Sequence, residues 1–208
     1  MVYNNGIILN RNINKYGLET SAIRTHVLLI VLLFISGVIM AQKPSHKFIH
    51  YGKQSGLNQS SVNFIYQDSQ DYLWIANFGG INKFDGYNFT SYVNEFNNEN
   101  SISDNSVWTI LERSNKTLWF GTKAGLSKYN RKTNNFNNYT IRNNENVSGT
   151  LAIKALFEDK EKRFYVGSEG EGLFVFSDEN KTFNRIKLIP EHAKVSAISE
   201  DISGNLWV

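Results

Sequence analysis

The chain contains no cysteine and only two prolines among its 208 residues. The absence of cysteine excludes a disulfide scaffold, a thiolate zinc site, a cysteine nucleophile and a lipid-modified cysteine at a mature N-terminus. Neither sign of charge is in large excess, because the formal net charge is only +3. The first 41 residues hold three cations and one anion, so the remainder carries a net charge of +1 and no basic stripe. We therefore expect no contact with nucleic acid.

The longest apolar run is too short for a membrane span. It covers residues 27–40 (VLLIVLLFISGVIM), whereas a transmembrane helix needs about 20 apolar residues. Arg24 precedes the run and Ala41 follows it, which is the layout of a secretory signal peptide cleaved after Ala41. Ile39 is larger than the residue preferred at its position before the cut, so an uncleaved anchor remains the alternative. We expect residues 1–41 to be a signal peptide helix and the rest of the chain to be exported to the periplasmic side of the cytoplasmic membrane.

The chain does contain one sequence pattern that is present in three complete copies and in the first part of a fourth. Aromatic anchors recur at spacings of 45, 46 and 42 residues: Trp74, Trp119, Tyr165 and Trp207. An aliphatic residue lies twelve positions before each anchor: Val62, Val107, Ile153 and Val195. A glycine follows six or seven positions after each of the first three: Gly80, Gly125 and Gly172. A repeat of this length predicts an array of identical supersecondary units.

Each repeat unit reads as four short strands joined by turns. In the first unit the strands are expected at residues 62–66, 72–76, 81–84 and 89–93. The 27 asparagines of the chain suit tight turns between such strands, because asparagine tolerates left-handed backbone. Four strands in about 45 residues are typical of a β-propeller blade. A helical repeat would need a period near 3.6, which no segment after Gln42 sustains.

We therefore expect an all-β protein built from β-propeller blades of four antiparallel strands, preceded by the signal peptide helix. Three blades are complete and a fourth begins, so the ring is incomplete, with blades at about residues 61–103, 104–149, 150–192 and 193–208. Residues 42–60 form a lead-in. Within it, residues 46–51 (HKFIHY) read as a strand that could close the ring on its last blade. The spaced aromatic residues would then fill the layers between blades.

The same residues resemble the two-component regulator propeller family. The resemblance rests on Gly56 to Val62 (GLNQSSV), on Leu73-Trp74-Ile75 and on residues 118–129 (LWFGTKAGLSKY), and it extends over residues 46–208. The repeat signature consists of Trp74, Gly80, Trp119, Gly121, Thr122, Gly125, Tyr165, Gly167, Gly172 and Trp207. Two departures stand out: Ala76-Asn77 replaces the Gly-Thr of the family, and Arg113 occupies a position that is Asp68, Asp159 and Asp201 in the other units.

The resemblance implies a function. Such propellers form the periplasmic sensor region of hybrid two-component histidine kinases of Bacteroidetes, and their usual signals are oligosaccharides released from glycans. In that family a membrane helix, a kinase, a receiver and a DNA-binding domain follow the propeller. We therefore expect the chain to be the N-terminal part of a longer, homodimeric sensor kinase whose enzymatic part lies outside this sequence. The alternatives are an exported propeller enzyme acting on glycans, as lyase or hydrolase, and a secreted binding or assembly propeller without a kinase.

No catalytic or metal-binding constellation is apparent, so we expect no cofactor. His46 and His50 would lie on one face of a strand about 13 Å apart, too far to share a metal ion. The acidic pairs Asp68 with Asp71 and Glu158 with Asp159 fall at predicted turns, where we expect solvent-facing capping roles. The residues that bind ligand are not identified. The polar loops at residues 94–105 and 143–150 are candidates that suit plain solvation equally well.

Overall fold

The computed structural model describes residues 23–33, 47–141, 150–190 and 192–208. The chain divides into two compact units, Met1–Ile49 and His50–Val208, which are described separately.

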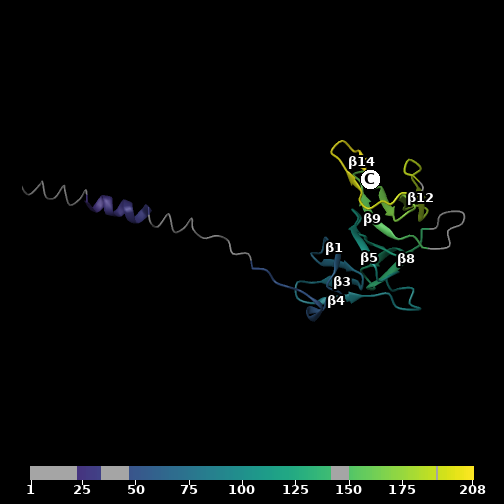
Figure 1. Cartoon of the computed structure of the whole chain (residues 1–208), viewed down its shortest axis with the longest axis horizontal. Coiled ribbons are helices and arrows are strands. Elements are labelled where there is room, and N and C mark those ends of the chain that lie inside the picture. The colour runs from purple at the N-terminus through teal and green to yellow at the C-terminus, as the bar shows by residue number, and fades with distance from the viewer. Residues whose placement is uncertain (1–22, 34–46, 142–149, 191) are drawn as a thin grey trace, which may run out of the picture. The chain divides into compact units, whose positions relative to one another are not determined.

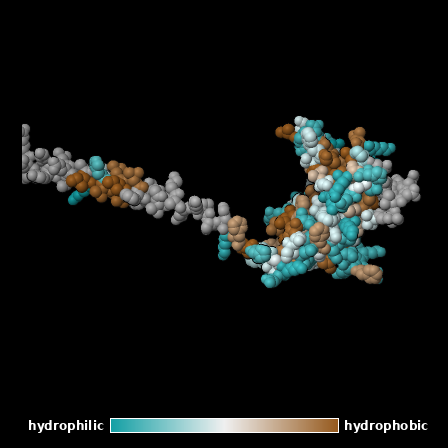
Figure 2. Space-filling model, viewed as in Figure 1, coloured by the Kyte–Doolittle hydropathy of each residue, from teal (hydrophilic) through white to brown (hydrophobic). Residues whose placement is uncertain are grey.

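In the first unit residues 23–33 form a helix whose apolar side chains are exposed, as the brown surface in Figure 2 shows. No helix in the described part of the chain is long and apolar enough to cross a membrane. The expected cleavage site after Ala41 lies outside the described residues, so the signal peptide stays a prediction.

The second unit consists of three four-stranded sheets, a short strand pair and one 3-10 turn, η1 (Lys53–Ser55). In each large sheet every strand pairs antiparallel with the next one along the chain. Blade 1 contains β1 (Val62–Gln67), β2 (Leu73–Asn77), β3 (Gly80–Phe84) and β4 (Phe89–Tyr92). Blade 2 contains β5 (Val107–Glu112), β6 (Leu118–Thr122), β7 (Gly125–Asn130) and β8 (Asn135–Tyr139). Blade 3 contains β9 (Ile153–Glu158), β10 (Phe164–Ser168), β11 (Leu173–Ser177) and β12 (Thr182–Arg185).

The pair β13 (Ser199–Glu200) and β14 (Leu206–Trp207) follows blade 3. The first strands of neighbouring blades contact each other, β1 with β5 and β5 with β9, while β4, β8 and β12 lie away from that line (Figure 1). This is the arrangement of propeller blades around an axis, so the predicted all-β propeller fold is confirmed.

The lead-in differs from the expectation. Residues 47–51, the described part of the segment expected to form a strand, pair with no other strand, and Phe48 is 93% exposed. Tyr51 instead packs its ring against Phe84 and Phe89 of blade 1, at centroid distances of 5.2 and 5.6 Å. A ring-closing role for the segment stays a prediction.

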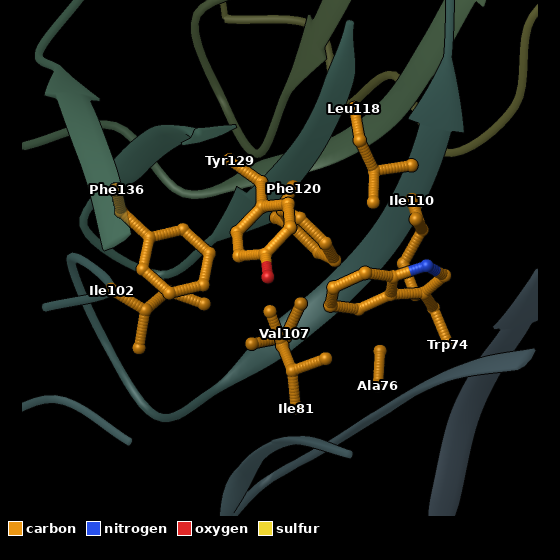
Figure 3. Packing of buried hydrophobic residues seen from close by; sticks show 10 residues of the cluster. All are labelled: Trp74, Ala76, Ile81, Ile102, Val107, Ile110, Leu118, Phe120, Tyr129 and Phe136. Atoms are coloured by element: carbon orange, nitrogen blue, oxygen red, sulfur yellow. The ribbon is translucent and has the colours of Figure 1, made fainter. Parts of the chain in front are cut away.

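The core lies between the blades rather than within any one of them. Trp74 of blade 1 is fully buried and packs against Phe120 and Tyr129 of blade 2, at ring centroid distances of 5.4 and 4.9 Å (Figure 3). Trp119 of blade 2 packs in the same way against Phe164 of blade 3, at 5.2 Å. Each blade therefore buries its anchor against the next blade, and its own sheet has little core without that neighbour.

The aliphatic side chains on the first strand of blade 1 are exposed, because no described blade precedes them. Val62 and Ile65 are 42% and 59% exposed, whereas Val107 and Ile110, at the same positions of blade 2, are buried in the core shared with blade 1. The aliphatic residues of the repeat are thus contacts for a preceding blade.

Two glycines of the repeat lie where the next blade approaches most closely. A Cβ atom on Gly121 would lie 2.6 Å from Thr109 Cγ2 and 2.9 Å from the carbonyl oxygen of Ile153, which begins blade 3. A Cβ atom on Gly167 would lie 2.5 Å from Val195 Cγ1. The glycines therefore allow the first strand of the following blade to pack against the second strand of the preceding one.

Replacing Gly121 by alanine should force blades 2 and 3 apart. We expect Gly121→Ala to lower the free energy of unfolding by about 1–3 kcal/mol, because a methyl group cannot fit against the backbone of Ile153. Gly52→Ala is the matched control, since a Cβ there meets only the His50 side chain at 3.4 Å. Urea unfolding of both variants measures the difference. Equal stability of the two variants would contradict this account of the junction.

Candidate functional site

The structure places the repeat signature in the packing and turns of the blades. Trp74, Trp119 and Tyr165 are buried, whereas Trp207 on β14 is 63% exposed. Gly80, Gly125 and Gly172 have positive φ angles of 113°, 106° and 78°, which favour glycine, and each begins or precedes the third strand of its blade.

Thr122 closes the turn between the second and third strands of blade 2. Its Oγ1 donates to the carbonyl of Gly125 at 3.0 Å and accepts from the amide of Ala124 at 3.1 Å. Ser168 makes the equivalent bonds to Gly172 and Glu171 in blade 3. In blade 1 the side chain of Asn77 accepts from the amide of Gly79 at 2.7 Å, which explains how Asn77 serves where Thr122 stands in blade 2.

An aspartate six positions before the anchor satisfies the polar atom of the anchor. The indole Nε1 of Trp74 donates to Asp68 Oδ2 at 2.8 Å, and the Tyr165 hydroxyl donates to Asp159 at 3.2 Å. Trp207 Nε1 donates to Asp201 at 3.2 Å. A buried indole N–H without an acceptor costs free energy, so this aspartate is part of the anchor.

In blade 2 this position is Arg113, and Trp119 finds another acceptor. Its Nε1 donates to Thr117 Oγ1 at 3.0 Å. Arg113 is nonetheless buried, and its guanidinium carbon lies 4.9 Å from the centre of the Phe164 ring in blade 3. The departure noted in the sequence is therefore located at a contact between blades.

At the junction of blades 1 and 2 the first blade supplies Asp68, and the second supplies Arg131 and Glu112. Arg131, in the β7–β8 turn, donates to Asp68 Oδ2 at 2.8 Å and to Glu112 Oε1 at 2.9 Å. Glu112 also accepts from the backbone amide of Ser69 at 2.7 Å. Both carboxylate side chains are almost completely buried, and they share the guanidinium of Arg131.

At the junction of blades 2 and 3 the positive and the negative side chain of the ion pair have exchanged places, compared with the first junction. Arg113 stands in the place of Asp68, and Asp178, in the β11–β12 turn, stands in the place of Arg131. Arg113 donates to Asp178 Oδ2 at 2.8 Å and to Glu158 Oε1 at 2.8 Å. The ion pair is therefore retained with reversed polarity, and the departure at residue 113 is compensated by a second departure at residue 178.

The glutamate is the constant member of every junction. Glu112, Glu158 and Glu200 each lie seven positions before an anchor. They accept from the amides of Ser69, Ser114 and Lys160 at 2.7, 2.5 and 3.1 Å, respectively. Each therefore connects the first strand of one blade to the first turn of the preceding blade.

The expected solvent-facing roles of Asp68, Glu158 and Asp159 are wrong. The carboxylates of Asp68 and Asp159 are buried, because each must accept the hydrogen bond of a buried anchor and the amides of its own turn. The Glu158 side chain is only 9% exposed, because it pairs with Arg113. The expectation for Asp71 holds, since its side chain lies at the surface. The recurrence of aspartate at a fixed distance from the anchor was the sequence signal for this role.

The pKa of Asp68 is lower than the ordinary 3.8. Burial alone would raise it, but hydrogen bonds from Trp74, Arg131 and the amides of Gln70 and Tyr72 stabilise the carboxylate more strongly than burial disfavours it. The pKa of Asp159 is lowered in the same way, with Arg163 as the main donor against burial.

The residues considered for chemistry do not come together. Within the described ranges no group of three or more His, Cys, Asp or Glu side chains could hold a metal ion. His50 is exposed, and His46 lies outside the described residues. The loop at residues 94–105 lines a groove of about 170 Å³ beside Phe136 on β8. Its polar groups mainly hold the loop itself, as in the bond from Asn98 to Glu95 at 2.7 Å. Of the other loop only Thr150 is described.

Comparison with known proteins agrees with the repeat. Residues 56–79 and 101–124, which include the first two strands of blade 1 and of blade 2, match the family described as two component regulator propeller. Histidine kinase P4 of Formosa agariphila is 38% identical over 74 residues, which are 36% of this chain and 5% of that protein. The chain therefore spans about a twentieth of this curated relative.

Solved structures share the fold. The extracellular domain of a hybrid two component system from B. thetaiotaomicron matches with a TM-score of 0.66 at 23% identity, over 76% of this chain and 23% of that one. The extracellular domain of a one component system from the same species gives 0.60 at 18%, over 79% and 20%. Virginiamycin B lyase from Staphylococcus aureus gives 0.54 at 16%, over 73% and 50%.

The meandering sheets, the anchors shared between sheets and these structural matches define a β-propeller repeat protein. The two matched segments fall on the blades whose anchors are Trp74 and Trp119. Residues 56–79 and 101–124 carry the repeat of the two-component regulator propeller family.

Exchanging the charges of the second junction tests whether they act as a pair. We expect Arg113→Asp alone to destabilise the protein by about 3–5 kcal/mol, because it leaves the buried Glu158 carboxylate without a cation and places a second carboxylate beside it. Asp178→Arg alone should cost less, since Asp178 is half exposed. The double variant reproduces the polarity of Asp68 with Arg131 and should regain at least about 1 kcal/mol over the sum of the single effects. Urea unfolding of the four proteins measures this coupling, and simple additivity would contradict the pairing.

The depressed pKa of Asp68 makes stability depend on pH in a stated direction. Because the folded-state pKa is below 3.8, the ionised carboxylate stabilises the fold above that pH, and this contribution disappears as pH falls through the folded-state value. Asp68→Asn should therefore lose about 1–3 kcal/mol at neutral pH and flatten the stability curve below about pH 4. Unfolding curves between pH 7 and 2, with the exposed Asp71→Asn as control, measure it. A parallel curve for Asp68→Asn would contradict the assignment.

Proposed function

We propose that the chain is the extracytoplasmic sensor propeller of a hybrid two-component protein. In this role it binds an oligosaccharide derived from a glycan and controls a histidine kinase across the membrane. The observation that carries the proposal is the repeat itself: the family matches of residues 56–79 and 101–124 occur in a chain related to a histidine kinase. The exposed apolar helix at residues 23–33 supports export of the propeller as part of a signal peptide.

The construction of the junctions suits a sensor. A ligand shifts a conformational equilibrium only by binding one conformation better than another. Neighbouring blades are tied by ion pairs, because Arg131 of blade 2 pairs with Asp68 of blade 1, and Arg113 of blade 2 pairs with Glu158 and Asp178 of blade 3. A ligand bridging two blades would therefore favour one blade arrangement, and the chain would pass that preference to whatever domain the propeller contacts.

The enzyme alternative has the fold match to a lyase in its favour and nothing more specific. A propeller fold hosts unrelated activities, so this likeness does not assign one. The alternative of a secreted binding or assembly module is distinguished from the sensor by the presence of a kinase under propeller control.

Binding and location test the proposal together. We expect the protein expressed in a Gram-negative host to be exported, and at least one class of oligosaccharide to raise its melting temperature. Ligand at about a hundred times its Kd adds roughly 2.7 kcal/mol of stability. Thermal unfolding with a panel of plant, algal and animal oligosaccharides measures this, with monosaccharide mixtures as controls. Retention in the cytoplasm, or no stabilisation by any oligosaccharide, would contradict the proposal.

A further inference from the structure

Each blade carries a β-bulge at the same position of its first strand. The register shifts between Val62 and Phe64, between Val107 and Thr109, and in blade 3 at Ile153 and Ala155 opposite Gly167-Ser168. The extra residues are Asn63, Trp108 and Lys154. A bulge re-aims its side chain away from the regular alternation of a strand. Since the first strands contact each other, these three side chains belong to the innermost part of the propeller.

The bulge residues differ where their neighbours agree. The positions just before them hold Val62, Val107 and Ile153, which pack between blades in blades 2 and 3. The bulge positions instead hold an amide, an indole and an amine. The turn residues four positions after the anchors vary equally: Phe78, Lys123 and Glu169. The packing that repeats from blade to blade therefore does not determine which residue types stand at these positions.

Two of the variable positions build an aromatic corner. Phe78, which is 43% exposed in the β2–β3 turn, meets the Trp108 ring edge-on at 4.9 Å and 83°. Lys154 Nζ lies 3.0 Å from the centre of the Trp108 ring, in cation–π contact. The Trp108 Nε1 atom is buried and has no acceptor among the described residues. An unsatisfied buried donor is uncommon, so stability alone does not explain this tryptophan.

A carboxylate holds two lysines beside the corner. Glu169 lies 3.0 Å from Lys154 Nζ and 2.7 Å from Lys194 Nζ through its two oxygens. Its side chain is 38% exposed and that of Lys194 is 58% exposed, so solvent reaches the group. Lys194 and Lys154 lower the pKa of Glu169. The carboxylate thus occupies the place that an external anion would take on the two ammonium groups.

We infer that Phe78, Trp108, Lys154, Glu169 and Lys194, called here the hub cluster, bind an acidic saccharide. A carboxylate or sulfate group of the sugar replaces Glu169 on Lys154 and Lys194, and the apolar face of the sugar ring packs on the aromatic corner. The residues come from blades 1, 2 and 3 and from the connection to β13, so the ligand bridges blades. This inference rests on the proposed function and specifies the class of its ligand.

Calorimetric titration of the full chain separates the parts of the inference. The probes are oligogalacturonides for the carboxylate, carrageenan oligosaccharides for the sulfate, and neutral gluco- and galacto-oligosaccharides of the same length. Lys154→Gln should weaken binding of the acidic probe by about tenfold or more, because a charge-assisted hydrogen bond is lost. Glu169→Gln should strengthen it by at least about threefold, because the internal competitor is removed. Lys132→Gln, an exposed lysine in the β7–β8 turn, is the matched control and should change nothing.

The opposite signs of the two variants make the result decisive. A purely structural role of the Lys154–Glu169 pair would weaken binding in both variants and would overturn the inference. Binding of a neutral saccharide, or binding of an acidic one that neither variant changes, would overturn the hub cluster but leave the proposed sensor function standing. No binding of any probe would overturn both. The uronate and sulfate arms show which anionic group the site takes.

Discussion

The burial of an aromatic anchor between two blades is the constraint on which the rest of this structure depends. Trp74 can be fully buried only if its indole N–H has an acceptor, which is Asp68. A buried carboxylate in turn needs a cation, and Arg131 of the next blade supplies it. Burial of this one aromatic side chain thus requires a series of polar contacts across the junction, from Trp74 through Asp68 to Arg131. These contacts tie neighbouring blades more specifically than apolar packing alone.

The second junction shows that this requirement concerns charge balance rather than particular residues. Arg113 and Asp178 replace an aspartate and an arginine, and Glu158 keeps the role that Glu112 has at the first junction. Trp119 then takes Thr117 as its acceptor. Because the polarity differs between the two junctions, each blade carries a face that matches its own neighbour. Mispairing of blades would place like charges together.

The sequence was sufficient to predict the blades, because the spacing of the anchors repeats and the strand signals between them are local. It was also sufficient to mark Arg113 as unusual. It could not show that Asp68 is buried, since a turn aspartate looks the same whether it faces water or an indole. Nor could it pair Arg113 with Asp178, 65 positions away, because that contact depends on how two sheets pack. Residues 47–51 show the same dependence on packing, because a β-rich segment becomes a strand only beside the edge of another strand.

Positions that repeat from blade to blade stabilise the molecule, whereas positions that vary are available for recognition. Residues that recur in every blade hold the junctions, whereas the bulge residues Asn63, Trp108 and Lys154 share a backbone geometry and no chemistry. A repeat protein can change such positions without disturbing its packing, and several blades then contribute to one surface. The proposed ligand surface follows from this division, since it uses residues that the junctions leave unspecified.

The most direct measurement of the central claim is hydrogen exchange of the individual indole N–H groups, followed by nuclear magnetic resonance. The account predicts slow exchange for Trp74, whose N–H is buried against Asp68 at the first junction, and fast exchange for Trp207, which is 63% exposed. Exchange of Trp74 as fast as that of Trp207 would contradict the claim that buried, hydrogen-bonded anchors hold the blades together.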